Sequence, residues 1–336
     1  MSNCVTLFDH AARFGQGEEA FKKIIEMQTK TNKVLEVLPF KACNDGTKEK
    51  AAIRTALPDV AWRMINAGVK PSKSASKQVS FTTGHLQALA KVDEELIELN
   101  GGAASATGQA YRLSENAAFM EKMNQEMATT IFYGDEKKNP AGFTGLAAYY
   151  YTMSAASVPT IYKERVLSNG GSGNGLTSMW FTCFAEDTVY GIYPAGTKAG
   201  FGYKDNGRVK VTDAAGGEYY AYESQYDWRA GLAVKDPRYV VRLANINALN
   251  MATTEEAATA FMDNMIRAFN RIENPNKGKM AIFCNRDVMT YLEICAIRAK
   301  NVRLGVKDFG GQEVLSFRGV PILCSDALTN AESAIS

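Results

Sequence analysis

The sequence predicts an α+β fold, in which helices pack against a sheet, and two observations carry this prediction. Three segments, 111–134, 254–272 and 285–299, repeat apolar residues at the spacing of a helix with one buried face. Residues 176–247 are instead rich in the β-branched and aromatic residues typical of strands. The chain of 336 residues is long for a single hydrophobic core, so we expect one elaborate domain or two.

The first part of the chain predicts an arm without a core of its own. Within residues 1–33, Ala20, Ile24 and Met27 stand at helical spacing, which indicates one short surface helix. No basic start followed by an apolar stretch occurs here, so we do not expect a signal peptide.

Residues 34–100 are interpreted as an extended two-stranded loop. Pro58 interrupts a first strand-like run, a Lys- and Ser-rich stretch follows, and Leu86, Ala88 and Ala90 alternate as a returning strand would. An isolated two-stranded ribbon is marginal in water, and a structureless loop of this length is improbable inside a compact domain. We therefore expect an intersubunit arm with a flexible basic tip rather than a solvated loop.

A long helix over residues 114–133 is the predicted spine of the fold. Ser114 can cap its N-terminus, because the hydroxyl accepts from an otherwise unpaired backbone N–H. Gly134 follows as a residue free to adopt the left-handed conformation that ends helices. The small-residue run 100–109 before the helix is interpreted as a hinge. The apolar residues that recur at every fourth position are Phe119, Met123, Met127 and Ile131.

The remaining part, residues 176–330, combines strands with two helices. A turn at 213–217 separates two strand-like runs and predicts a hairpin. Thr254 and Asn285 are the expected N-caps of the two helices. A strand, a corner at Gly319–Pro321 and another strand complete this part.

The charge is unevenly distributed, although the net charge is only +2, too small to indicate a nucleic-acid binder. Residues 41–77 carry eight basic and three acidic side chains, whereas residues 93–126 carry two basic and seven acidic ones. We therefore expect the basic arm of one subunit to lie across the acidic hinge and spine of the next. The candidate basic contacts are Lys48, Lys50, Arg54, Lys70, Lys73 and Lys77. The candidate acidic contacts are Asp93, Glu94, Glu95, Glu98, Glu115 and Glu121.

Other classes of function find little support in the sequence. No apolar run of about 18 residues could cross a membrane. The six cysteines include no CxxC pair, and the two histidines stand apart from them, so neither a zinc site nor a cofactor is expected. Motifs of serine hydrolases, zinc proteases and P-loop enzymes are missing, so we do not expect an enzyme.

Four stretches resemble the major capsid proteins of tailed bacteriophages, which share the Hong Kong 97 phage fold. The most specific are AIFCNRDVMTYLEI (281–294) and FRGVPILCSDAL (317–328). LPDVAWRMINAGVKPSKS (57–74) and NQEMATTIFYGD (124–135) are similar to the coat proteins of one group of short-tailed phages. The resemblance covers nearly the whole chain, and the order of the stretches makes it specific.

This resemblance implies an icosahedral virion head around packaged double-stranded DNA, assembled in the host bacterial cytoplasm from pentamers and hexamers of this chain. The implied partners are other copies of the chain, a scaffolding protein, a portal protein, a decoration or cement protein, and DNA held by weak non-specific contact. By position, the parts would be an N-terminal arm and helix (1–33), the extended loop (34–100), a peripheral domain with the spine (101–175), and an axial domain with the remaining peripheral strands (176–330).

The order of the motifs departs from the commoner family members. In those, the stretch that ends in a GxPI-type corner precedes the tyrosine-rich β segment, whereas here the corner comes last. This departure implies rearranged chain connectivity. An encapsulin-like cage around a cargo enzyme is the alternative function, and a soluble enzyme of unrecognised class is a less favoured one.

Overall fold

The structure is a computed structural model that describes residues 33–197, 200–213, 215–248, 251, 255–298, 304–309 and 312–336. The helix predicted within residues 18–33 lies outside the described residues except for Lys33, and so does Thr254.

The described elements form runs of strands and runs of helices, as expected of an α+β chain. The helices are α3 (Val34–Val37), α4 (Glu94–Leu99), α5 (Ala106–Tyr133), α6 (Leu146–Tyr149), α7 (Thr160–Lys163), the 3-10 helix η1 (Pro237–Tyr239), α8 (Glu255–Asn270) and α9 (Arg286–Arg298). The strands are β1 (Phe40–Ala42), β2 (Lys48–Ala56), β3 (Ala75–Asp93), β4 (Val166–Ser168), β5 (Leu176–Phe184), β6 (Val189–Tyr193), β7 (Phe201–Thr212), β8 (Glu218–Val234), β9 (Val240–Asn247), β10 (Lys279–Cys284), β11 (Leu304–Phe309), β12 (Gln312–Phe317) and β13 (Val320–Cys324).

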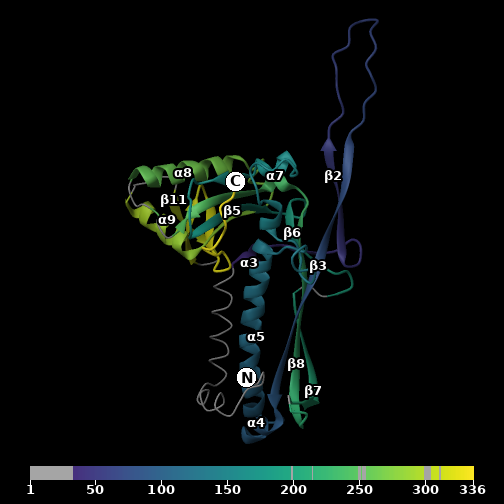
Figure 1. Ribbon diagram of the computed structural model, residues 1–336, viewed down its shortest axis with the longest axis vertical. Coiled ribbons are helices and arrows are strands. Elements are labelled where there is room, and N and C mark those ends of the chain that lie inside the picture. Colours follow the sequence, from purple (N-terminus) through teal and green to yellow (C-terminus); the bar gives the residue numbers. More distant parts are fainter. Residues whose placement is uncertain are drawn as a thin grey trace.

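The molecule has a body and two extensions that leave it in opposite directions (Figure 1). The body contains β5, α8 and α9, and α5 runs away from it beside the long strands β3, β7 and β8. The hairpin β2–β3 projects from the other end of the body. Hydrogen-bonded neighbours form a path of strands in the order β11-β12-β13-β10-β5-β6-β8-β3-β2, so β3 belongs to both extensions. Off this path, β7 pairs with β8, β1 with β6, and β9 with β4 and β5.

Strand β5 divides the body into two hydrophobic cores. All nine of its residues are buried, because β9 and β10 flank it and both of its faces are covered. Successive side chains of a strand point to opposite faces. Trp180 accordingly joins the core that also contains Phe132 of α5, whereas Phe181 joins the core beneath α8 and α9. This sorting explains why large apolar residues follow one another here instead of alternating with exposed polar ones.

The spine helix α5 begins earlier than the sequence predicted. Its N-cap is Ser105, whose side chain accepts from Gly108 N at 3.0 Å, so Ser114 is not the cap and the last four residues of the predicted hinge, 106–109, belong to the helix. A Cβ on Gly108 would overlap Gly102 O, so this glycine allows the close turn that starts the helix. The 28 residues of α5 span about 42 Å.

Replacing Ser105 with alanine is expected to destabilise the unassembled chain by about 1 kcal/mol, because the capping hydrogen bond is lost. Ser114→Ala is the control, since Ser114 lies inside α5 and does not cap it. Urea denaturation followed by circular dichroism measures both variants. Equal losses in the two variants would contradict the assignment of the cap.

Gly134 ends the spine as predicted, but not in a left-handed conformation. Its φ of −54° and ψ of 142° are those of extended backbone. A glycine is needed here for another reason, because a Cβ would collide with the carbonyl oxygens of Phe143 and Thr130. The end of the spine is thus packed tightly against the loop that returns to the body.

A buried ion pair joins the spine, the sheet and the last residues of the chain. Arg242 donates to Glu332 Oε2 at 2.8 Å, and their side chains are 5% and 6% exposed. The same guanidinium donates to Ser178 Oγ at 2.9 Å and to Tyr150 O at 2.8 Å. At the end of α5, the Tyr133 hydroxyl donates to Glu332 Oε1 at 2.5 Å. Burial, reinforced by the charge of Glu332, raises the pKa of the Tyr133 phenol, which therefore stays protonated as a donor.

Among the described residues, no helix is both long enough and apolar enough to span a bilayer.

Candidate subunit-contact surfaces

The predicted two-stranded arm is confirmed, and its root is held firmly by the body. β2 and β3 pair antiparallel from Lys48–Thr82 to Ala56–Ala75. The Glu49 carboxylate is buried on β2, where it accepts from the Tyr190 hydroxyl at 3.0 Å and from Asn44 N at 2.8 Å. Burial and the nearby Glu49 charge raise the pKa of Cys43 to about 11. The direction of the arm is therefore set by contacts within its own chain.

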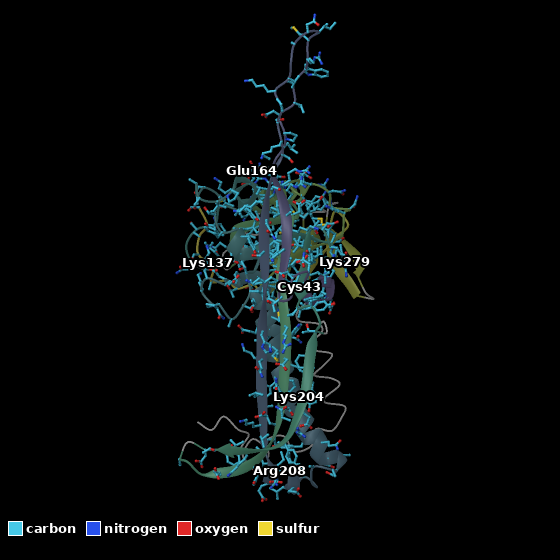
Figure 2. The ribbon with its side chains drawn as sticks, turned by 90° about the vertical axis from the view of Figure 1, so that its right-hand side faces the viewer. Cys43, Lys137, Glu164, Lys204, Arg208 and Lys279 are labelled. Carbon is cyan, nitrogen blue, oxygen red and sulfur yellow. The ribbon has the colours of Figure 1, made fainter. Side chains whose placement is uncertain are left out.

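The tip of the arm, defined here as residues 57–74, carries exposed apolar side chains that the sequence analysis did not single out. Figure 2 shows these side chains standing clear of the rest of the protein. Inside the tip, Ser72 Oγ donates to Asp59 O at 2.8 Å. The large apolar side chains, each at least 47% exposed, are Leu57, Val60, Trp62, Met64, Ile65 and Val69. An unpartnered apolar group of this size is typical of an interaction surface.

The candidate basic residues are distributed along the whole arm, and all of them are exposed. Lys48, Lys50 and Arg54 lie on β2, Lys70 and Lys73 lie in the tip, and Lys77 lies on β3. Lys50 is engaged within its own chain by Asp45 at 2.6 Å. Within the described part of the chain, none of the other five forms an ion pair, so their charges remain available to a partner.

Four of the candidate acidic residues, Asp93, Glu94, Glu95 and Glu98, lie at α4, at the end of the molecule opposite the tip (Figure 1). Asp93 is the N-cap of α4 and accepts from Glu95 N at 3.0 Å. Glu94 pairs with Arg208 of β7 at 2.8 Å, while Glu95 and Glu98 are exposed.

The two spine acids are not part of the same cluster. Glu121 is exposed further along α5 and accepts from Gln125 at 3.1 Å. Glu115 also lies on α5, but its side chain is outside the described residues.

One basic residue of the β7–β8 hairpin, Arg208, compensates part of the acidic charge by pairing with Glu94. In two other pairs the hairpin supplies the acid: Glu223 pairs with Lys91 of β3 at 3.3 Å, and Asp205 pairs with Arg112 of α5 at 2.5 Å. The hydrogen bond from Arg112 lowers the pKa of Asp205. Local charge counts missed the pairing of Arg208, because β7 lies about a hundred residues from α4 in the sequence but beside it in space.

A small groove lies where the spine meets β3, and we call it the spine groove. Its volume is about 120 Å³. Leu86 of β3, Met127 of α5 and Phe143 of the following loop provide its apolar lining, and Glu126 and Asn139 are among its polar residues. An apolar floor with polar neighbours suits an inserted side chain of a partner.

No group of three or more His, Cys, Asp or Glu side chains in the described part is placed to hold a metal ion. The five cysteines of that part are free, and four of them are buried.

The comparisons with known proteins agree with the arm, spine and body described above. The model of the family "Major capsid protein GP7" matches residues 16–336. A chain in the near-atomic structure of bacteriophage epsilon15 is similar, with a TM-score of 0.71 and 28% identity over 99% of this chain and 98% of that chain.

Two further structures are more distant. The bacteriophage JBD30 capsid has a TM-score of 0.49 and 11% identity, covering 96% of this chain and 99% of that chain. An encapsulin complex of Synechococcus elongatus has a TM-score of 0.42 and 11% identity, covering 75% of this chain and 100% of that chain. The search of curated proteins found no match. The family match spans nearly the whole chain, so the protein belongs to the GP7 major capsid protein family and is a structural protein of a bacteriophage capsid.

Proposed function

We propose that the chain assembles into pentamers and hexamers that tile a closed icosahedral shell around packaged double-stranded DNA. The observation that carries this proposal is the arm, whose root is fixed to the body while the large apolar side chains of its tip are exposed. An extension of this kind is stable only when it lies on another subunit. Because the net charge is only +2, the shell encloses DNA by weak non-specific contact rather than by gripping it.

The assembly needs further partners and no chemistry of its own. A scaffolding protein guides the curvature of the shell, a portal protein occupies one vertex, and a decoration or cement protein binds the outside. The chain is structural and catalyses no reaction. Residues 1–33 form the N-terminal arm, 34–100 the extended loop, 101–175 the peripheral domain, and 176–330 the axial domain with the remaining peripheral strands, in a rearranged connectivity.

Co-production of the chain with a scaffolding protein of the same phage tests the proposed shell. Size-exclusion chromatography and electron microscopy should show closed particles hundreds of ångströms across, in which five- and six-fold clusters alternate. A chain that remains a monomer or small oligomer with the scaffold present would overturn the proposal.

Charge complementarity adds to the contact between neighbours. The exposed basic residues of the arm and the exposed acidic residues Glu95 and Glu98 lie at opposite ends of one molecule. A head-to-tail arrangement of neighbours therefore brings opposite charges towards each other. Each exposed pair contributes only about 0–1 kcal/mol, so the effect depends on many copies.

Charge reversal of Lys70, Lys73 and Lys77 to glutamate is expected to lower the yield of shells, most strongly at low salt, where screening is weak. The matched control reverses the exposed lysines Lys137, Lys138 and Lys204, which lie outside the arm. Particle yield and the heat resistance of the particles measure both variants. Arm-variant shells that form and survive heating as the wild type does would show that these charges do not contribute.

A further inference from the structure

We propose that Trp62 of one subunit inserts into the spine groove of a neighbouring subunit and is the main anchor of the arm. This inference rests on the proposed shell and names the two surfaces that meet in it. The contact is therefore mainly apolar, and the arm charges only assist it.

The surface that inserts is the tip, where Trp62 is the largest of the exposed apolar side chains. Its side chain is fully exposed, at 104%, and Ile65 and Val60 beside it are at least 90% exposed. Tryptophan is enriched among the few residues that dominate protein interfaces, and such residues are surrounded by weaker contacts that exclude water. Val60, Met64 and Ile65 are placed in the sequence to provide that surrounding ring.

The receiving side is the spine groove, whose floor is apolar and whose charged lining is acidic. Leu86, Met127 and Phe143 offer contacts to the faces of an indole ring. Asn139 provides polar atoms near the indole N–H. Glu126, which also forms an exposed ion pair with Lys122 at 3.5 Å, has the charge opposite to that of Arg63, the residue that follows Trp62 in the tip.

A subunit cannot fill its own groove, because the arm holds the tip away from it. Gly84 and His85 line the groove on β3, and Ala75 begins the same strand nine residues earlier. Nine extended residues span about 30 Å, and the tip continues beyond Ala75 in the direction away from the groove (Figure 1). The occupant must therefore come from a second copy of the chain.

Cross-linking in assembled shells tests the pairing directly. Ala61→Cys places a thiol beside Trp62 without removing it, and Thr130→Cys places one on the spine at the groove. A short bismaleimide should link the double variant into covalent dimers and longer ladders on denaturing gels. The matched control combines Ala61→Cys with Asp263→Cys, which is exposed on α8 of the body, away from both the spine groove and α4, and should give no ladder.

Substitution of Trp62 tests how much this side chain contributes to the yield of shells. Trp62→Ala should lower the yield of shells at least tenfold at both low and high salt, because salt does not screen an apolar contact, and Trp62→Phe should recover part of the yield. The unassembled Trp62→Ala subunit should unfold as the wild type does, since Trp62 makes no contact in its own chain. Cysteine-variant shells that cross-link in the control pair but not in the groove pair, or Trp62→Ala shells formed in normal yield, would overturn the anchor and leave the proposed shell intact. Wild-type protein that forms no shell would overturn both.

Discussion

Replacing Arg242 with methionine is expected to destabilise the folded subunit by about 3–5 kcal/mol, because the partner carboxylate of Glu332 is left buried without its counter-charge. The guanidinium now satisfies three acceptors, on Glu332, Ser178 and Tyr150, and lies 5.0 Å from the ring centre of Trp180. Methionine fills a similar space but offers no donor to any of them. Urea denaturation of the unassembled subunit measures the loss.

A surface pair offers the matched control for this substitution. Arg286 and Asp326 also lie 2.8 Å apart, but their side chains are 74% and 39% exposed. Arg286→Met should therefore change the stability little, since water replaces the lost partner. The double substitution Arg242→Met with Glu332→Leu should recover much of the loss, because no buried charge remains unpaired. Equal effects of Arg242→Met and Arg286→Met would contradict this account.

Truncation of Phe132 to alanine is the second substitution with a large expected effect, about 3–5 kcal/mol. Phe132 is fully buried near the end of α5, with ring centres 5.8 Å from Phe283 of β10 and 6.4 Å from Trp180 of β5. Its removal leaves a cavity between the spine and the sheet that the rigid strands cannot fill. The same denaturation experiment measures the loss, and hydrogen exchange should show faster opening at the end of the spine.

Phe119, three to four turns earlier on the same helix, is the control for this truncation. It is only half-buried and stacks on Tyr226 at 5.8 Å. Phe119→Ala should therefore cost clearly less than Phe132→Ala, and Phe132→Leu should lie between Phe132→Ala and the wild type. A larger loss for Phe119→Ala would mean that the spine is held to the sheet mainly at its other end.

Local patterns in the sequence predicted much of the fold correctly. Asn285 caps α9, because its side chain accepts from Val288 N at 2.9 Å. The turn at 213–217 joins β7 to β8 as an antiparallel hairpin. The start of the spine was wrong, because both Ser105 and Ser114 are good caps and only the close approach of Gly102 to Gly108 distinguishes them.

Local sequence patterns predicted the candidate contact surfaces less well. The charge count over residues 93–126 did not include Arg208, which pairs with Glu94 although 114 residues separate them. Trp62 belongs to a run that resembles a strand, so its full exposure could not be expected from its neighbours in the sequence.

The sequence by itself determined the α+β class, the long spine, the hairpins and the two-stranded arm, because helix and strand periodicity, caps and turns depend on residues within a few positions of one another. The tertiary structure alone decided which distant groups meet: Arg242 with Glu332, Phe132 with Phe283, and β3 with β8. It also decided that the large apolar side chains of the tip are exposed. These outcomes depend on how segments about a hundred residues apart pack in space, and no local spacing encodes that packing.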